Sequence, residues 1–429
     1  MTAEIAVMNQ EAVALAADSA VSGPKIFTSA NKIFALSKYH PIAVMVNDSA
    51  QFLGVPWETI IKTYRADLGQ RSFATLREQA AHFLGFFNRP NPLFPTVAQE
   101  GCNTSLFVRF FSEILDHIDR RLDERTSEGE TLELDDIADE AAKIIAEVAE
   151  MYLTTDSASP PSTDAHDESI LSAYGEIIDG CIAHVFEELP LSAKTVGQLR
   201  DIAVSLVGAG EANPLSPFHS GIVIAGFGRD EYFPSLYEFE LETIALDRLK
   251  YVQRDSTQIG PQDGRAVVRA FAQQEQVATF MTGIDTSVRE ATISFWENRL
   301  PRLVETAADR VPMDDKSKTK LKEDMADACQ KAIDEFSENI DSLTGEIYVQ
   351  PIIRVVAMMP KDELAAMAES LVNLTSFKRK VTEEAETVGG PIDVAVISKG
   401  DGLVWVKRKH YFAPELNPQF FANYYRTEI

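Results

Sequence analysis

The strand patterns near both ends of the chain constrain its fold most strongly. Ile5–Val7 and Val13–Ala17 are short apolar segments separated by the polar turn Asn9–Glu11, which predicts a β-hairpin. Near the other end, "GGPIDVAVISKGDGLVWVKRK" contains two more such segments around a Lys-Gly-Asp-Gly turn. Strands joined by hairpins pair antiparallel, unlike the strands of alternating βαβ units. We therefore expect an α+β fold with antiparallel sheets.

The middle of the chain mixes helical and strand patterns. Strands are predicted at Gly221–Gly226, Ser235–Glu240 and Leu249–Val252. Helical spacing is seen in residues 56–68, 73–87, 103–152 and 170–208, and a helical block is expected over about 264–345. "EIYVQPIIRVV" then reads as a short β-like segment, followed by a helix that starts near Pro360.

Composition narrows the classes of protein that this chain can belong to. Its 429 residues are 45% hydrophobic, which is enough for a substantial core, and no apolar run approaches the roughly 18 residues of a membrane helix. The three cysteines show no metal or redox spacing, the histidines form no metal-binding set, and the Gly turns lack the lysine of a phosphate loop. We expect a cytoplasmic protein with no membrane association, no metal and no cofactor.

The charge is strongly acidic and unevenly distributed. The chain has 66 acidic and 40 basic residues, a net charge of −26, which argues against a nucleic-acid partner. Residues 101–190 hold 22 Asp and Glu against 5 Lys and Arg. This segment is interpreted first as a solvated helix face, with a docking surface for a basic partner as the alternative.

Two segments far apart in the sequence carry a family resemblance. "AVALAADSAVS…NKIFAL" is similar to the first strands of the proteasome β-subunit family of N-terminal nucleophile hydrolases, and "GGPIDVAVISKGDGLV" resembles the final hairpin of that family. The resemblance implies a four-layer αββα sandwich of two antiparallel sheets. It also implies a core of residues 1–98, 216–284 and 359–429, with an acidic helical insertion at 99–215 and a second helical insertion at 285–358.

The resemblance also implies a catalytic site. Thr2, Asp18 and Lys32 match the family's nucleophile, its positioning carboxylate and its lysine, and Thr2 becomes the first residue once Met1 is removed. Such an enzyme uses the threonine hydroxyl as nucleophile and the α-amine of the same residue as base. The lysine lowers the proton affinity of the hydroxyl, and the carboxylate holds the lysine in place.

Supporting positions depart from the family pattern. The family usually has Gly where a backbone amide stabilises the oxyanion, and here the aligned "AVMVND" places that amide near Val46 or Asn47. The polar residues that would stand in for the family's supporting side chains are Ser256, Glu384, Glu386 and Thr387.

The leading functional hypothesis is a proteasome-like threonine hydrolase that cleaves a peptide or another amide bond. The alternatives are a catalytically inactive scaffold that uses its helical insertions to bind a partner, and a hydrolase of small-molecule amides. The family resemblance implies a homo-oligomer, which in the family is a ring, and a peptide or protein substrate. The sequence leaves open whether a separate ATPase delivers that substrate. We expect the acidic first insertion to lie away from the subunit contacts, because it would repel its own copies.

Overall fold

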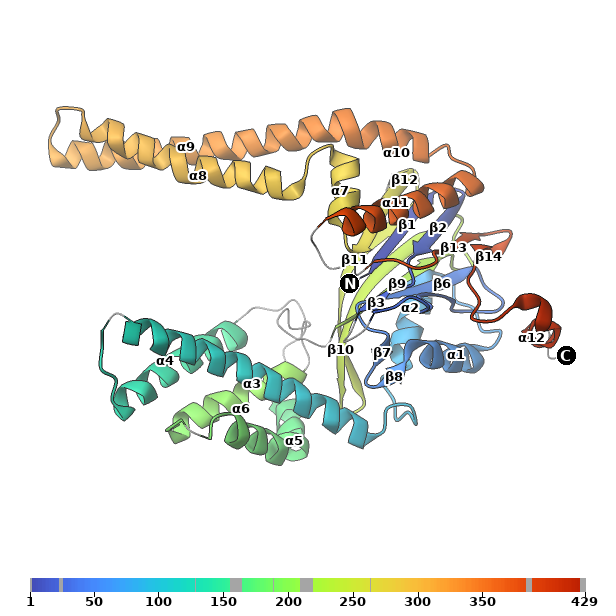
Figure 1. Ribbon diagram of the computed structural model, residues 1–429, viewed down its shortest axis with the longest axis horizontal. Coiled ribbons are helices and arrows are strands. Elements are labelled where there is room, and N and C mark those ends of the chain that lie inside the picture. The colour runs from blue at the N-terminus through green and yellow to red at the C-terminus, as the bar shows by residue number, and fades with distance from the viewer. Residues whose placement is uncertain are drawn as a thin grey trace. The chain divides into compact units, whose positions relative to one another are not determined.

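The computed structural model describes residues 2–22, 26–127, 129–154, 164–187, 189–208, 219–262, 264–382 and 388–424 (Figure 1). The chain divides into two compact units. Unit 1 contains residues 1–33 and 258–429, and unit 2 contains residues 34–257. Unit 1 therefore combines segments from both ends of the chain.

Unit 1 contains an antiparallel five-stranded sheet in the order β12-β1-β2-β13-β14. Its strands are β1 (Ala3–Asn9), β2 (Ala12–Ala17), β12 (Ala266–Ala272), β13 (Asp393–Ser398) and β14 (Gly402–Lys407). Both predicted hairpins, β1–β2 and β13–β14, are confirmed. Because β2 pairs with β1 on one side and β13 on the other, the two hairpins join in the middle of the sheet.

One side of this sheet is covered by helices. In β1, Ala3, Ile5 and Val7 alternate onto the face that packs in one apolar cluster with α11 (Lys361–Val381). The cluster also receives Val277 and Met281 from α7 (Glu275–Thr282) and Val356 from α10 (Gln350–Val356). Every residue of β1 and β2 is buried, so these strands are interior elements of the molecule.

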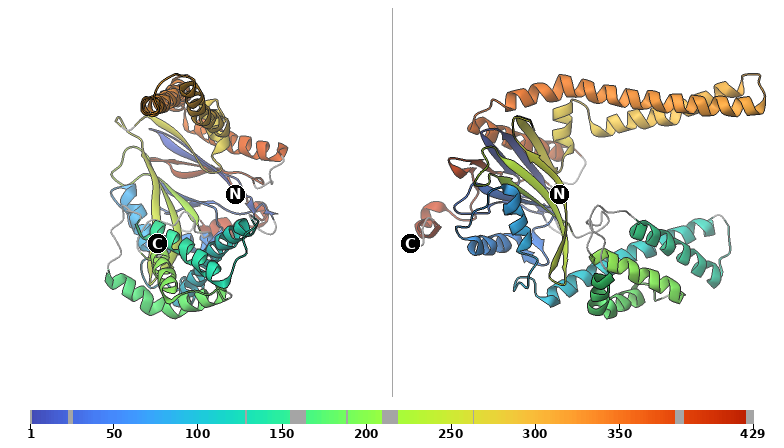
Figure 2. Two further views of the ribbon diagram at one scale, coloured as in Figure 1. Left: turned by 90° about the vertical axis from the view of Figure 1, so that its left-hand side faces the viewer. Right: turned by 180° about the vertical axis from the view of Figure 1, so that it is seen from behind.

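A long helical hairpin belongs to the same unit. It consists of α8 (Thr286–Asp309) and α9 (Asp315–Thr344), which lie side by side in Figures 1 and 2. Arg289 of α8 binds Asp341 of α9 at 2.8 Å, and Lys322 of α9 pairs with Asp309 of α8 at 2.9 Å. The helix continues through the π-helical turn η1 (Gly345–Val349) into α10. Asn9 anchors that end, since its Nδ2 donates to the carbonyls of Val356 and Met359.

Unit 2 contains the second five-stranded antiparallel sheet, in the order β11-β10-β9-β6-β5. Its strands are β5 (Ile33–Ala35), β6 (Ile42–Asn47), β9 (Ser220–Gly226), β10 (Ser235–Ala245) and β11 (Arg248–Gln258). Helices α1 (Trp57–Leu68) and α2 (Leu76–Gly85) share one apolar cluster with β6, β9 and β10. Stacked and edge-to-face rings of Phe52, Trp57 and Phe87 fill part of this core.

Four further helices of unit 2 build a separate apolar cluster. They are α3 (Thr96–Ser127), α4 (Leu134–Thr154), α5 (Asp164–Val185) and α6 (Ala193–Val207). Figure 2 shows them grouped together. Polar side chains near the start of α3 attach this bundle to the sheet: Asn103 Nδ2 donates to the carbonyl of Ile244 at 3.1 Å, and Gln99 Nε2 donates to Asp247 at 2.8 Å.

Two local predictions are wrong. The β-like segment "EIYVQPIIRVV" is helical, in η1 and α10, because it continues α9 and places Val356 in the core under α11. The expected helical block over about 264–345 instead begins with strand β12, since Ala266–Ala272 completes the free edge of β1. In both places tertiary contacts override the local pattern.

The predicted α+β class, with two antiparallel sheets and helices packed on them, is confirmed. The division into a core with insertions at 99–215 and 285–358 stays a prediction. Within the described part of the chain, no helix is long and apolar enough to cross a bilayer.

Candidate functional site

Asp18 lies directly after β2 and binds the chain beside Thr2. Its backbone N–H donates to the carbonyl of Ala3, and its carboxylate Oδ1 accepts the N–H of Ala3, both at 3.1 Å. These bonds continue the β1–β2 ladder past its last strand residues. They hold Asp18 against the residue that follows Thr2.

The Asp18 carboxylate is buried, with 1% of the residue exposed, and is well supplied with donors. Oδ1 also accepts from Lys32 Nζ at 2.5 Å, and Oδ2 accepts the N–H groups of Ala20 at 3.1 Å and Gly389 at 2.9 Å. A buried carboxylate is costly unless hydrogen bonds and a counter-charge replace its water. Here three backbone donors and one ammonium group do so.

Lys32 is also buried, and its main-chain surroundings are fixed by the C-terminal part of the chain. Arg408 Nη1 donates to the carbonyl of Ile33 at 3.3 Å and to Asp393 Oδ2 at 2.9 Å. Lys409 Nζ binds the same Asp393 oxygen at 2.5 Å, and the Lys409 N–H donates to Asp393 Oδ1 at 2.8 Å. Burial lowers the pKa of Lys409, and the charges of Arg408 and Lys32 lower it further, although Asp393 opposes this effect.

Sequence reasoning missed this second ion cluster. In the basic segment "WVKRKHYF", Arg408 and Lys409 pair with Asp393 of the same chain. The available signal was Asp393 itself, a lone acid at the start of an otherwise apolar strand.

Thr2 is nearly enclosed, with 4% of the residue exposed. Its Oγ1 lies 3.5 Å from Glu4 Oε1, and its carbonyl accepts the N–H of Gln273 at 3.3 Å. Glu4 is fully buried in β1. Sequence reasoning also missed Glu4, although an acid between Ala3 and Ile5 in a buried strand could have marked it. The threonine hydroxyl therefore has a carboxylate as its neighbour.

A Gly-Gly segment closes the site from the other hairpin. The Ser19 N–H donates to the carbonyl of Gly389 at 3.1 Å, and the Ser19 hydroxyl donates to the carbonyl of Pro391. Gly390 has φ +78°, and a Cβ on it would lie 2.9 Å from Thr28. Only glycine fits that position without strain, so the predicted Gly-Gly motif has a conformational reason.

The other predicted residues are not joined to this cluster by described contacts. Val46 and Asn47 end β6 in unit 2, where they are buried and pair with Ile222 and Gly221 of β9. Ser256 lies exposed on β11, also in unit 2. Glu384, Glu386 and Thr387 lie outside the described residues. The roles of all these residues stay predictions.

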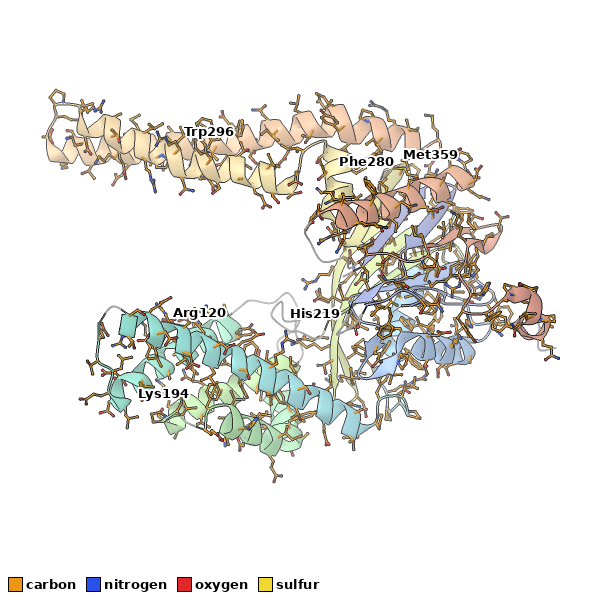
Figure 3. The ribbon with its side chains drawn as sticks, viewed as in Figure 1. Arg120, Lys194, His219, Phe280, Trp296 and Met359 are labelled. Atoms are coloured by element: carbon orange, nitrogen blue, oxygen red, sulfur yellow. The ribbon has the colours of Figure 1, made fainter. Side chains whose placement is uncertain are left out.

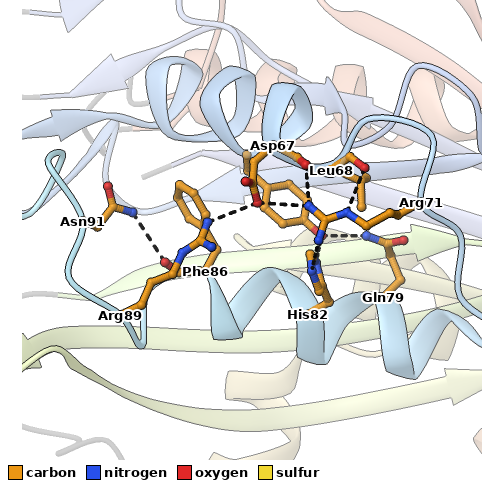
Figure 4. A network of polar contacts seen from close by, with 9 residues as sticks. Asp67, Leu68, Arg71, Gln79, His82, Phe86, Arg89 and Asn91 are labelled. Carbon is orange, nitrogen blue, oxygen red and sulfur yellow. Dashed lines mark hydrogen bonds and ion pairs between the residues drawn. The ribbon is translucent and has the colours of Figure 1, made fainter.

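A polar network between α1 and α2 in unit 2 has a structural role (Figure 4). Tyr64 accepts from Gln79 Nε2 at 2.7 Å and contacts His82 Nδ1 at 2.8 Å, while Asp67 pairs with Arg71 and Arg89. Burial raises the pKa of Tyr64 and lowers the pKa of His82. The Tyr64 and His82 side chains are therefore neutral near pH 7. Their hydrogen bonds connect helices α1 and α2.

Unit 2 also contains a pocket of about 420 Å³ between α3 and the sheet, near His219 in Figure 3. Small residues of α3 line one wall of the pocket, and His219, Ser220 and Glu242 line the opposite wall. Burial raises the pKa of the Cys102 thiol in this pocket, which disfavours the nucleophilic thiolate. Among the described residues, no group of three His, Cys, Asp or Glu side chains is placed to hold a metal.

Comparisons with known proteins add little to this geometry. No family model matches the chain, and no curated protein sequence matches it. Among solved structures, the Gly-1 mutant of Anbu from Hyphomicrobium sp. strain MC1 is similar, at 8% sequence identity and a TM-score of 0.27. The match covers 100% of this chain and 99% of that chain. Such a TM-score supports no conclusion by itself, so function is inferred from the residues around Thr2.

Proposed function

We propose that this protein is a proteasome-like threonine hydrolase that cleaves a peptide or another amide bond, with Thr2 as nucleophile once it is the first residue of the mature chain. The observation that carries the proposal is the buried Lys32–Asp18 pair, hydrogen-bonded to the backbone beside Thr2. A buried ammonium–carboxylate pair is expensive to maintain for stability alone. Its position next to a threonine gives it a chemical use.

In the proposed reaction, Thr2 Oγ1 attacks the carbonyl carbon of the amide while the Thr2 α-amine takes the hydroxyl proton. The amine then gives that proton to the leaving nitrogen as the C–N bond breaks, which leaves an ester on Thr2. Water hydrolyses the ester by the same route, and the carboxylic acid product departs. The ammonium of Lys32 lowers the proton affinity of the hydroxyl, and Asp18 holds Lys32 in place.

Further residues are assigned supporting roles in this proposal. A backbone N–H near Val46 or Asn47 donates to the oxyanion of the tetrahedral intermediate. Ser256, Glu384, Glu386 and Thr387 are proposed to support the Thr2 amine and its water. Glu4, which the threonine hydroxyl contacts, orients that hydroxyl in the free enzyme.

The test compares wild type with Thr2→Ala and Thr2→Ser on a panel of peptide amides and small acyl amides. Intact mass first shows whether Thr2 is the first residue of each purified protein. We expect turnover by wild type, a residual rate for Thr2→Ser because it keeps a hydroxyl, and none for Thr2→Ala. Equal cleavage by wild type and Thr2→Ala would contradict the mechanism. The panel also separates a peptidase from a small-amide hydrolase.

The burial of Thr2 favours a second candidate, a non-catalytic scaffold of the same fold. In that case residues that precede Thr2 remain attached and block its amine. Intact mass separates the two candidates cheaply. A mature chain that begins at Thr2 and is acylated by an amide substrate supports the hydrolase, and a blocked Thr2 with no turnover supports the scaffold.

A further inference from the structure

The pocket between α3 and the sheet of unit 2 is open because small side chains line its helical wall. Ala98, Gly101, Cys102 and Ser105 recur at the spacing i, i+3, i+4 and i+7, so they share one face of α3. A Cβ on Gly101 would meet no atom within 4 Å. The volume of about 420 Å³ lies in the range of small-molecule sites. The pocket is therefore large enough to hold a small ligand.

Two oppositely charged side chains line this pocket from neighbouring strands (Figure 3). Leu241 of β10 pairs with Ser220 of β9, and the same register continued by one residue sets Glu242 opposite His219. The hydrogen bond to Glu240 raises the pKa of His219, and the charge of Glu242 adds to this effect, although burial opposes it. Side chains opposite each other in an antiparallel pair have Cβ atoms roughly 4.5–5.5 Å apart. One small molecule can therefore reach both the carboxylate and the imidazole.

Both charged groups have a counter-ion in the protein and can also bind a ligand. Glu242 Oε2 pairs with Lys250 Nζ at 3.3 Å, and an ionised carboxylate can accept hydrogen bonds at about four lone-pair positions. His219 Nδ1 lies 2.6 Å from Glu240 Oε1, so Nε2 is the ring nitrogen that can donate to a ligand when the imidazole is protonated. The pocket thus offers a negative acceptor beside a positive donor.

We propose that this pocket binds a free α-amino acid, whose ammonium group donates to Glu242 and whose carboxylate accepts from His219. An α-amino acid carries both groups on one carbon atom, which suits two protein charges on neighbouring strands. Such charge-assisted hydrogen bonds are stronger than neutral ones. Ser49 adds a hydroxyl to the lining, and Phe52 and Leu53 add apolar surface for the ligand's side chain. None of these residues has a role in the proposed hydrolysis, so the two proposals are tested separately.

Isothermal titration calorimetry of the full chain with L-leucine, followed by a panel of other L-amino acids, tests the ligand class. We expect saturable binding of at least one of them. The matched probes are the amide of that amino acid, which lacks the carboxylate, and its N-acetyl derivative, which lacks the ammonium group. Each should bind about tenfold or more weakly. The proposal is overturned if no amino acid binds, or if either blocked derivative binds as tightly as its parent.

Substitutions test the location. Gly101→Leu puts a side chain into the pocket and is compatible with α3, because Leu has a higher helix propensity than Gly. It should abolish binding in a protein that circular dichroism shows to be folded. Gly180→Leu on α5 is the matched control, since a Cβ there also meets no atom within 4 Å and Gly180 does not line the pocket. Glu242→Gln and His219→Gln should each weaken binding about tenfold or more. Full binding by Gly101→Leu would place the ligand elsewhere and overturn the proposal.

A native cysteine gives an independent measure of occupancy. Cys102 lines the pocket and is partly exposed. Cys329 of α9 is also partly exposed but does not line the pocket, so it serves as the internal control. Labelling with iodoacetamide, followed by peptide mass, should slow at Cys102 and stay unchanged at Cys329 when the amino acid is saturating. Equal rates at Cys102 with and without saturating ligand, or equal slowing at both cysteines, would contradict binding in this pocket.

Discussion

Asp18 and Lys32 form one buried ion pair, but they differ in the hydrogen-bond partners that each would keep if the other were removed. Asp18 keeps three backbone N–H donors when the lysine is removed. Lys32 is held by Asp18 through its ammonium group, and it is 4% exposed. Breaking a buried pair by removing one partner costs about 3–5 kcal/mol, because an uncompensated charge remains.

We therefore predict that Asp18→Ala lowers the free energy of unfolding by about 3–5 kcal/mol, and that Lys32→Met costs less. Urea unfolding followed by circular dichroism measures both, with Lys62→Met on the exposed face of α1 as the control. If Lys32→Met proves the more damaging change, the three backbone donors do not support Asp18 as described. These stability measurements are independent of the proposed catalysis.

His219 and Glu240 form a second pair, in unit 2, whose strength depends on pH. His219 Nδ1 lies 2.6 Å from Glu240 Oε1, and Arg254 binds the other carboxylate oxygen at 2.5 Å. Burial alone would raise the pKa of Glu240, but the hydrogen bonds from His219 and Arg254 outweigh it and lower that pKa from 4.5 to about 2. The hydrogen bond to Glu240 raises the pKa of His219 above 6.5.

The directions of these two pKa shifts define the pH range in which the His219–Glu240 pair stabilises the protein most. Glu240 contributes stability that is complete above pH 4.5 and is lost as pH falls through about 2. His219 contributes stability that is complete below pH 6.5 and is lost as pH rises through its raised pKa. The difference in unfolding free energy between wild type and His219→Gln should therefore be largest between about pH 4.5 and 6.5. A difference that grows steadily above pH 7 would contradict this assignment.

At the scale of elements, one side chain connects the β1–β2 hairpin to the helices that follow α9. Asn9 Oδ1 accepts the N–H groups of Glu11 and Ala12 in the turn, and Asn9 Nδ2 donates to the carbonyls of Val356 and Met359. Asn9 is buried. One amide thus satisfies four backbone groups, two in the β1–β2 turn and two at the end of α10.

We predict that Asn9→Ala lowers the free energy of unfolding by about 2–3 kcal/mol, because buried backbone groups lose their partners. Asn339→Ala on the exposed face of α9 is the control and should change stability by less than about 0.5 kcal/mol. Hydrogen exchange should rise first in 350–359 and in the β1–β2 turn. Unchanged exchange in both segments would show that Asn9 does not connect them.

At the scale of the whole molecule, the excess of acid in residues 101–190 is expected to keep this segment out of contacts between copies. Twenty-two acidic and five basic residues would repel their counterparts, and salt would reduce that repulsion. A cysteine placed at the exposed Glu124 of α3, in a Cys329→Ser background, should react with a maleimide equally fast in monomer and oligomer. Protection of that position on association would refute the prediction.

Much of the fold was predictable because local patterns and long-range partners agree. The β1–β2 and β13–β14 hairpins carry their own turn and alternation signals, so both strand pairs could be located from residues adjacent in the chain. Asp18 and Lys32 could be paired in advance only through the family resemblance. Local periodicity contains no information about which charges meet.

The sequence by itself determined the hairpins, the amphipathic helices and the acidic character of residues 101–190, since each depends on neighbours in the chain. Tertiary structure decided that Ala266–Ala272 is a strand, because β1 offered it an edge, and that Gly345–Val356 is helical, because Val356 packs in the core with α11. It also decided that Arg408 and Lys409 meet Asp393, and that Glu4 lies beside Thr2. A buried charge needs a partner, and only the folded chain determines which residue comes within reach.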